Sequence, residues 1–193
     1  MLRAGALPAP LTIVEERTIS ASLGEDSIHA GVRAGVVGII LVVLIMVGYY
    51  RLSGALAVAA LALYTLFTFG GLAAFGFTLT MPGLAGFVLS VGIAVDANVL
   101  IFERIREELQ HGKLVRTAVD EGFKHAMSAI IDSNVSTALT AFILYLVGTG
   151  PVQGFAITLI IGIAASMVTA VYVVRTFYMV WLQRRPDLVT LSV

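Results

Sequence analysis

The sequence predicts an all-α integral membrane protein, a bundle of five transmembrane helices that follows a short extracytoplasmic N-terminal tail. Two observations carry this prediction. Hydrophobic residues make up 59% of the 193 residues and charged residues only 12%, whereas about a quarter of the residues in soluble domains are charged. The charges are also segregated, because none lies between Arg51 and Asp96. Uncharged stretches of that length are typical of membrane spans.

A transmembrane helix needs about 20 mostly apolar residues, and several stretches of the chain satisfy this. Turn residues separate them, such as Arg51-Leu-Ser-Gly54 and the proline of Thr80-Met-Pro-Gly83, since proline is tolerated in the first turn of a helix. Residues 104–126 are too charged for lipid. We expect them to continue the third span as a helix, to turn at His111-Gly112 and to form a second short helix. The expected spans are 31–50, 54–75, 83–103, 127–148 and 153–176.

Basic residues predict the orientation of the bundle. They gather in the 104–126 loop, at Arg51 and near the C-terminus, whereas the loops 76–82 and 149–153 carry no charge. Because basic loops stay on the cytoplasmic side of a membrane, we expect a cytoplasmic C-terminus and an outer N-terminus. An outer N-terminus without a targeting sequence suggests a piece of a longer protein. The expected divisions are an outer tail at 1–28, a transmembrane domain at 29–182 and a cytoplasmic tail at 183–193.

Composition also excludes several kinds of chemistry. The chain has no cysteine, which rules out disulfides, thiolate metal sites and a cysteine nucleophile. The histidines His29, His111 and His125 show no spacing of metal ligands. The net charge is zero, so nothing indicates a nucleic-acid partner. We expect no cofactor and no enzymatic activity.

Small residues indicate how the helices pack. Spans in lipid associate through close backbone approach and interhelical hydrogen bonds. Gly92 lies one turn before Asp96, so the sequence predicts that this carboxylate lies on a face against another helix. The last span carries small residues at every fourth position, and we interpret them as packing residues: Gly154, Thr158, Gly162, Ser166 and Ala170.

Asp96 is the principal candidate for function. It interrupts the third span, about 10 Å from its cytoplasmic end at 1.5 Å per residue. A charged side chain inside a membrane costs about 2.5–3.5 kcal/mol on insertion scales, so such residues usually face a partner or a wet cavity and handle protons or ions. The alternative interpretation is that Asp96 only hydrogen-bonds a neighbouring helix and never titrates. We expect it to be buried, with the 132–137 segment and polar groups of the last span, Thr158, Ser166 and Thr169, as neighbours.

Asp132 is a second candidate for proton transfer. It lies about 8 Å inside the fourth span, in a polar stretch from Asp132 to Thr137. Asp132-Ser-Asn-Val repeats the pattern of Asp96-Ala-Asn-Val, which indicates related roles. We expect Asn98, Asn134, Gly92 and Thr137 to support the relay or its packing. The alternative is that Asp132 is a helix-entry residue close enough to the headgroups to stay hydrated.

The stretch Ala94-Val-Asp-Ala-Asn-Val-Leu-Ile-Phe-Glu-Arg-Ile-Arg-Glu-Glu-Leu109 resembles the signature of the SecD family of bacterial protein-export proteins. Leu2-Arg-Ala-Gly-Ala-Leu-Pro-Ala-Pro-Leu11 is similar to the end of that family's periplasmic domain. Gly148-Thr-Gly-Pro-Val-Gln-Gly-Phe-Ala-Ile-Thr-Leu159 and Asp132-Ser-Asn-Val-Ser-Thr137 resemble its later motifs. The resemblance covers essentially the whole chain, in order. It identifies the chain as the C-terminal transmembrane part of a SecD-type protein.

This resemblance implies a function in the bacterial inner membrane, with a periplasmic N-terminus. Members of the family pair with SecF, resemble the RND superfamily, associate with the SecYEG channel and use the proton-motive force to aid export after the ATP-driven step. Protons are then the coupling ion, and membrane lipid surrounds the chain. Asp96 falls on the family's proton-carrying aspartate. Preprotein would be handled by a periplasmic domain, of which residues 1–28, with a strand at Leu11-Thr-Ile-Val14, would be the remnant.

Two other functions compete with this one. A structural subunit would carry an aspartate that stays neutral, which titration of Asp96 would test. An intramembrane aspartyl protease would need two carboxylates that share a proton, here Asp96 and Asp132. Neither aspartate stands in the Gly-x-Gly-Asp motif expected of such enzymes.

Overall fold

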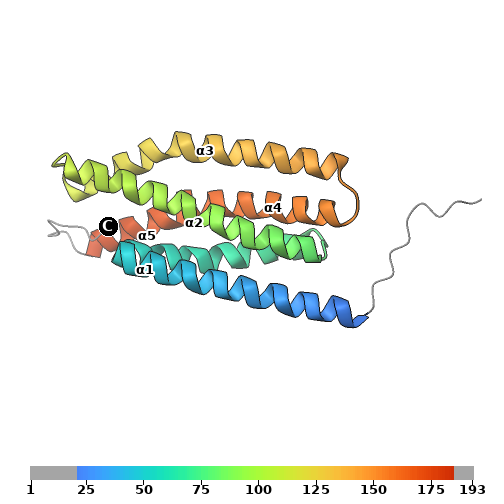
Figure 1. Cartoon of the computed structure of the whole chain (residues 1–193). Coiled ribbons are helices and arrows are strands. Elements are labelled where there is room, and N and C mark those ends of the chain that lie inside the picture. The colour runs from blue at the N-terminus through green and yellow to red at the C-terminus, as the bar shows by residue number, and fades with distance from the viewer. Residues whose placement is uncertain (1–20, 185–193) are drawn as a thin grey trace, which may run out of the picture.

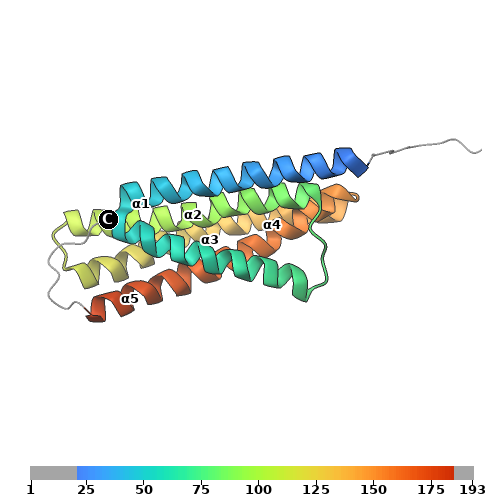
Figure 2. The same ribbon diagram turned by 90° about the horizontal axis from the view of Figure 1, so that it is seen from below.

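The computed structural model describes the chain from residue 21 to residue 184. This part is helical, and the helices lie side by side as long antiparallel rods (Figures 1 and 2). The predicted strand at 11–14 and the C-terminal tail from 185 onward lie outside the described residues, whereas 21–28, expected in the tail, begin the first helix. The elements are α1 (Ala21–Ala74), α2 (Met81–Gln110), α3 (Val115–Val147), α4 (Pro151–Val168), the π-helix η1 (Thr169–Val174) and α5 (Arg175–Arg184).

Helix α1 contains both of the first two expected spans. Its backbone leaves helical geometry at Arg51, where φ is 46° and ψ is −107°, and the chain reverses direction there (Figure 2). Gly54 makes this reversal possible, because a Cβ at residue 54 would overlap the carbonyl oxygen of Met46. Counted as continuous helices, the described residues therefore contain four helices long and apolar enough to cross a membrane rather than five.

The turn between α2 and α3 follows the sequence prediction only in part. Helix α2 continues beyond the expected third span to Gln110, and Gly112 turns the chain with φ of 80°. The expected second short helix is wrong as a separate element, because α3 begins at Val115 and runs without a break to Val147. The charged residues from Arg116 to Lys124 therefore lie in the first turns of a spanning helix.

Helix α2 contacts α1, α3 and α4 and packs most extensively against α4. A Cβ at Gly86 would lie 2.9 Å from the carbonyl oxygen of Phe155, and one at Gly162 would lie 2.5 Å from Ser90 Oγ. Thr158 and Ser166 are buried, so the small residues of the last span pack against other helices, as predicted. Ser90 Oγ and the Tyr64 hydroxyl, at 2.5 Å, add a buried hydrogen bond between α2 and α1.

The two ends of the bundle differ in charge. One end holds the reversal at Arg51, the α2–α3 turn and the end of α5 (Figure 1). The opposite end holds the start of α1 and the uncharged loops 75–80 and 148–150. The basic groups of the described residues that were used for the orientation prediction thus lie at the same end.

Candidate functional site on the open face of α2

Asp96 lies on a face of α2 that no other part of the described chain covers. Its side chain is exposed, as are Ala85, Leu89 and Gly92 along the same stripe of the helix. A Cβ at Gly92 would meet nothing within 4 Å. The prediction that Asp96 is buried by helices of this chain is therefore wrong. Which face of α2 is covered depends on how α1, α3 and α4 pack around it, and α4 packs on the opposite face.

The polar groups proposed as neighbours of Asp96 are turned inward. Thr158, Ser166 and Thr169 are buried in the last helix, and each hydroxyl donates a hydrogen bond to a carbonyl oxygen of its own helix. Among the described residues, Asp96 has neither a hydrogen-bond partner nor an ion-pair partner. Its carboxylate therefore lacks, within this part of the chain, the partner that a membrane-embedded charge requires.

The two Asp-x-Asn-Val stretches place their asparagines inside the bundle and their aspartates outside. Asn98 and Asn134 are 4% and 2% exposed, whereas Asp96 and Asp132 are exposed. Residues two positions apart lie about 200° apart around a helix, which accounts for the opposite directions. The sequence repeat is thus a structural repeat as well.

The buried asparagines are only partly hydrogen-bonded. Asn134 Nδ2 donates to the carbonyl oxygen of Ile130 at 2.8 Å, but the Oδ1 atoms of Asn98 and Asn134 have no partner among the described residues. Thr137 is half-buried, and its hydroxyl donates to the carbonyl oxygen of Ser133 at 2.8 Å. These contacts fit a packing role for the asparagines and give Thr137 no contact with Asp96.

A polar cluster joins α1 to α2 where the charged part of α2 begins. The Tyr50 hydroxyl donates to Glu103 Oε1 at 2.9 Å, and Arg106 Nη1 donates to the Tyr49 hydroxyl at 3.1 Å. Arg106 also lies 3.8 Å from Glu103. Glu103 and Arg106 lie three positions apart on α2, whereas the tyrosines come from the reversal in α1, and their contact with α2 was not predicted from the sequence.

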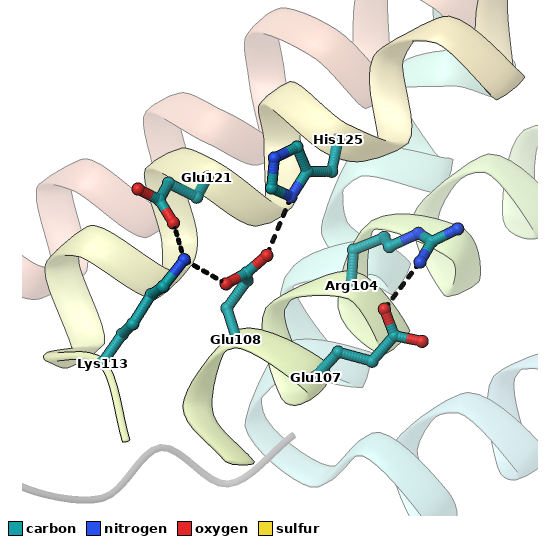
Figure 3. Close-up of polar contacts among 6 residues, drawn as sticks. All are labelled: Arg104, Glu107, Glu108, Lys113, Glu121 and His125. Carbon is teal, nitrogen blue, oxygen red and sulfur yellow. Dashed lines mark hydrogen bonds and ion pairs between the residues drawn. The ribbon is translucent and has the colours of Figure 1, made fainter. Parts of the chain in front are cut away.

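A second cluster holds the α2–α3 turn together and was missed by sequence reasoning (Figure 3). Glu108 is buried, at 7% exposed. Lys113 Nζ donates to Glu108 Oε2 at 2.5 Å and also pairs with Glu121. His125 Nδ1 lies 2.8 Å from Glu108 Oε1, and the ring nitrogen is the donor because an ionised carboxylate only accepts. The available signal was a glutamate shortly before a glycine turn, with a lysine directly after that turn.

The electrostatics of this second cluster are those of a fixed ion pair. The hydrogen bond from Lys113 holds the pKa of Glu108 below its ordinary value, and the contact with His125 acts in the same direction. The hydrogen bonds to Glu108 and Glu121 raise the pKa of Lys113. Both partners therefore stay charged at neutral pH, and the cluster stabilises the turn rather than exchanging protons.

The described residues contain no group of histidine and carboxylate side chains arranged to hold a metal. Asp96 and Asp132 are not hydrogen-bonded to each other, so the described chain does not assemble the proton-sharing pair of an aspartyl protease.

The fold and the site define a helical membrane protein with one ionisable side chain on the open face of an apolar span. Comparison with known proteins then gives the family. Residues 6–184 match the family model of the protein export membrane protein SecD/SecF, C-terminal, and the chain belongs to this family.

Characterised relatives and solved structures agree. The translocase subunit SecD of Rhodothermus marinus is 56% identical over 178 residues, which are 92% of this chain and 29% of that protein. The corresponding subunit of Syntrophobacter fumaroxidans is 55% identical over 92% of this chain and 33% of that protein. The crystal structure of SecDF from Thermus thermophilus, a translocon-associated membrane protein, superimposes with a TM-score of 0.84 at 42% identity, covering 88% of this chain and 24% of that one. The chain thus spans about a third of the length of these relatives or less.

Proposed function

We propose that this chain is the membrane part of a SecD subunit that uses the proton-motive force to aid protein export after the ATP-driven step, with Asp96 as its proton carrier. The observation that carries the proposal is the position of Asp96 on an apolar span, exposed and without a partner among the described residues. A carboxylate in that position is expected to face a partner or a hydrated cavity. Protons are the coupling ion, and no cofactor is needed.

The open face of α2 supports SecF as the partner. Gly92 leaves room for close backbone approach beside Asp96, as helix contacts in membranes require. The relatives are named as SecD or SecDF proteins. Through SecF the chain would associate with the SecYEG channel, and preprotein would contact the periplasmic part of a full-length subunit.

The proposed location is the bacterial inner membrane, with the N-terminus in the periplasm and the C-terminus in the cytoplasm. Its support is the concentration of basic residues at the end of the bundle that holds Arg51, the α2–α3 turn and the end of α5. Basic loops stay in the cytoplasm. Reporter fusions at Gly112 and Phe77 should give opposite compartments, and equal signals from both would contradict this orientation.

The proposed mechanism uses alternating surroundings of a single carboxylate. An apolar partner surface around Asp96 favours the neutral acid, whereas water or a cation of the partner favours the carboxylate. A change between these surroundings during a conformational cycle would take up a proton on one side and release it on the other. Asp132 is a second candidate for this relay. Asn98, Asn134 and Thr137 support the packing of the two helices that carry Asp96 and Asp132.

The test is Asp96→Asn in a full-length subunit assembled with SecF and reconstituted with SecYEG. Asparagine keeps the size of the side chain and removes its titration. We expect normal assembly, measured by co-purification, together with loss of the proton-driven part of preprotein export. Asp132→Asn, from the same sequence repeat, is the comparison variant for the second relay candidate and should have the smaller effect. Export at the wild-type rate by Asp96→Asn under a proton gradient would make Asp96 a structural residue.

A further inference from the structure

A cavity of about 500 Å³ opens between α3 and the junction of η1 with α5. Its apolar lining comes from Phe123 and Met127 of α3 and Val171 of the π-helix η1. Asp120, Glu121, Lys124 and Arg175 form its polar border. The lining residues belong to the N-terminal part of α3, up to residue 127 where the expected span begins, and to the junction of η1 with α5. These segments lie toward the basic end of the bundle (Figure 1). Apolar lining and charged border thus meet where a membrane surface would lie.

The charged side chains of the lining balance in number, with two carboxylates and two cations, but they are not all paired with one another. Arg175 Nη2 donates to Asp120 Oδ1 at 3.2 Å, and Glu121 pairs with Lys113. Lys124 and Arg116 are exposed and have no ion-pair partner among the described residues. Both lie four positions from Asp120, and therefore on the same stripe of α3. Of the two cations in the lining, Arg175 pairs with Asp120 and Lys124 is left without an ion-pair partner among the described residues, and Arg116 is a further unpaired cation on the same stripe of α3.

We propose that this cavity binds an anionic phospholipid, with its phosphate on Lys124 and Arg175 and its upper acyl chain over Met127 and Val171. The proposal rests on the membrane orientation given under the proposed function. Basic pockets between membrane helices on the cytoplasmic side recognise anionic headgroups. The apolar lining favours a lipid over free phosphate, because phosphate has no acyl chain to contact the lining. The occupant is therefore a lipid with a net negative headgroup rather than a neutral one.

The experiment measures lipid retention by native mass spectrometry of the purified 193-residue chain. The chain is titrated in detergent with phosphatidylglycerol or phosphatidylcholine. Each cation near a membrane surface favours an anionic lipid by about fivefold. We expect wild type to retain phosphatidylglycerol well above phosphatidylcholine, and Lys124→Gln to lose about fivefold of that preference. Arg175→Gln should lower it similarly, whereas Arg104→Gln, an exposed cation paired with Glu107 away from the cavity, should keep it.

A second variant tests the apolar part of the site. Val171→Trp fills the lining and leaves every cation in place, so we expect loss of retained lipid with unchanged helical circular dichroism. Equal retention by wild type, Lys124→Gln and Val171→Trp would overturn the proposal, and so would displacement of the lipid by millimolar inorganic phosphate, which would identify a simple phosphate site. Neither SecF nor a proton gradient is present in this assay. Its failure is therefore distinguishable from a failure of the role proposed for Asp96.

Discussion

Asp96 and Glu108 are carboxylates on the same helix with opposite surroundings. Glu108 is 7% exposed and contacts both Lys113 and His125. Asp96 is exposed on an apolar span and has no partner among the described residues. The first is satisfied within this chain, and its charge holds a turn together. The second needs something outside this part of the chain. A carboxylate that the fold does not satisfy is the better candidate for function.

Two glycines give the largest contrast between the closed and open sides of the bundle. A Cβ at Gly122 of α3 would lie 2.8 Å from the backbone nitrogen of Ile105, whereas one at Gly92 would meet nothing within 4 Å. We expect Gly122→Leu to destabilise the chain by about 3 kcal/mol, since overpacking a close contact costs about 1–3 kcal/mol or more. Gly92→Leu should leave stability unchanged or slightly raised, because glycine is a poor helix former.

Unfolding in mixed detergent micelles, followed by circular dichroism, measures both variants. Gly92→Leu should also prevent co-purification of a full-length subunit with SecF, although the chain itself stays folded. A destabilised Gly92→Leu would mean that the face around Asp96 is packed within the chain, and the contrast would then fail.

Glu108 and Glu107 give an intermediate contrast at the α2–α3 turn. Glu107 makes only an exposed pair with Arg104 at 2.7 Å (Figure 3). We expect Glu108→Ala to lower Tm by several degrees and Glu107→Ala to lower it little, because exposed ion pairs contribute little. Glu108→Ala instead leaves Lys113 and His125 without their shared acceptor.

The same pair of variants has a pH dependence. The pKa of Glu108 in the folded chain lies below its ordinary value of 4.5, so the unfolded chain binds more protons in acid. The contribution of Glu108 to the free energy of unfolding therefore falls as pH falls. The Tm difference between wild type and Glu108→Ala should be constant near neutral pH and shrink below about pH 4.5. A difference that persists unchanged in acid would show that packing, rather than charge, accounts for it.

The smallest expected effect is that of Asp96→Asn on the chain alone. Because Asp96 contacts no polar group among the described residues, the substitution should change the free energy of unfolding in detergent by no more than about 0.5 kcal/mol. The measurement is the same micelle titration. A large loss of stability would place a partner for Asp96 inside this chain and weaken the case for SecF.

The fold was predictable where composition and turn residues decide it. Uncharged stretches indicated the spans, and Arg51 to Gly54 indicated the first reversal. The direction of Asp96 was not predictable in the same way. A single apolar helix offers no polar face to orient it, and the covered face is chosen by neighbours distant in sequence. Asp96 and Asn98, two positions apart, lie on opposite sides of α2, and only the packed structure shows that Asn98 is the buried one. The contact between Glu108 and His125 was not predictable either, because it depends on the turn at Gly112, which brings together side chains 17 positions apart.

The π-helix η1 changes the angular phase of the last helix. Buried residues recur at every fourth position from Thr158 to Tyr178, although residues four apart in an α-helix drift by about 40° each time, or about 200° over that distance. A π-turn holds one extra residue, and this residue offsets about 100° of the accumulated rotation. The regular spacing therefore describes a helix with one wide turn. Deleting a single residue within 169–174 would rotate Arg175 and Tyr178 by about 100°, which removes Tyr178 from the core.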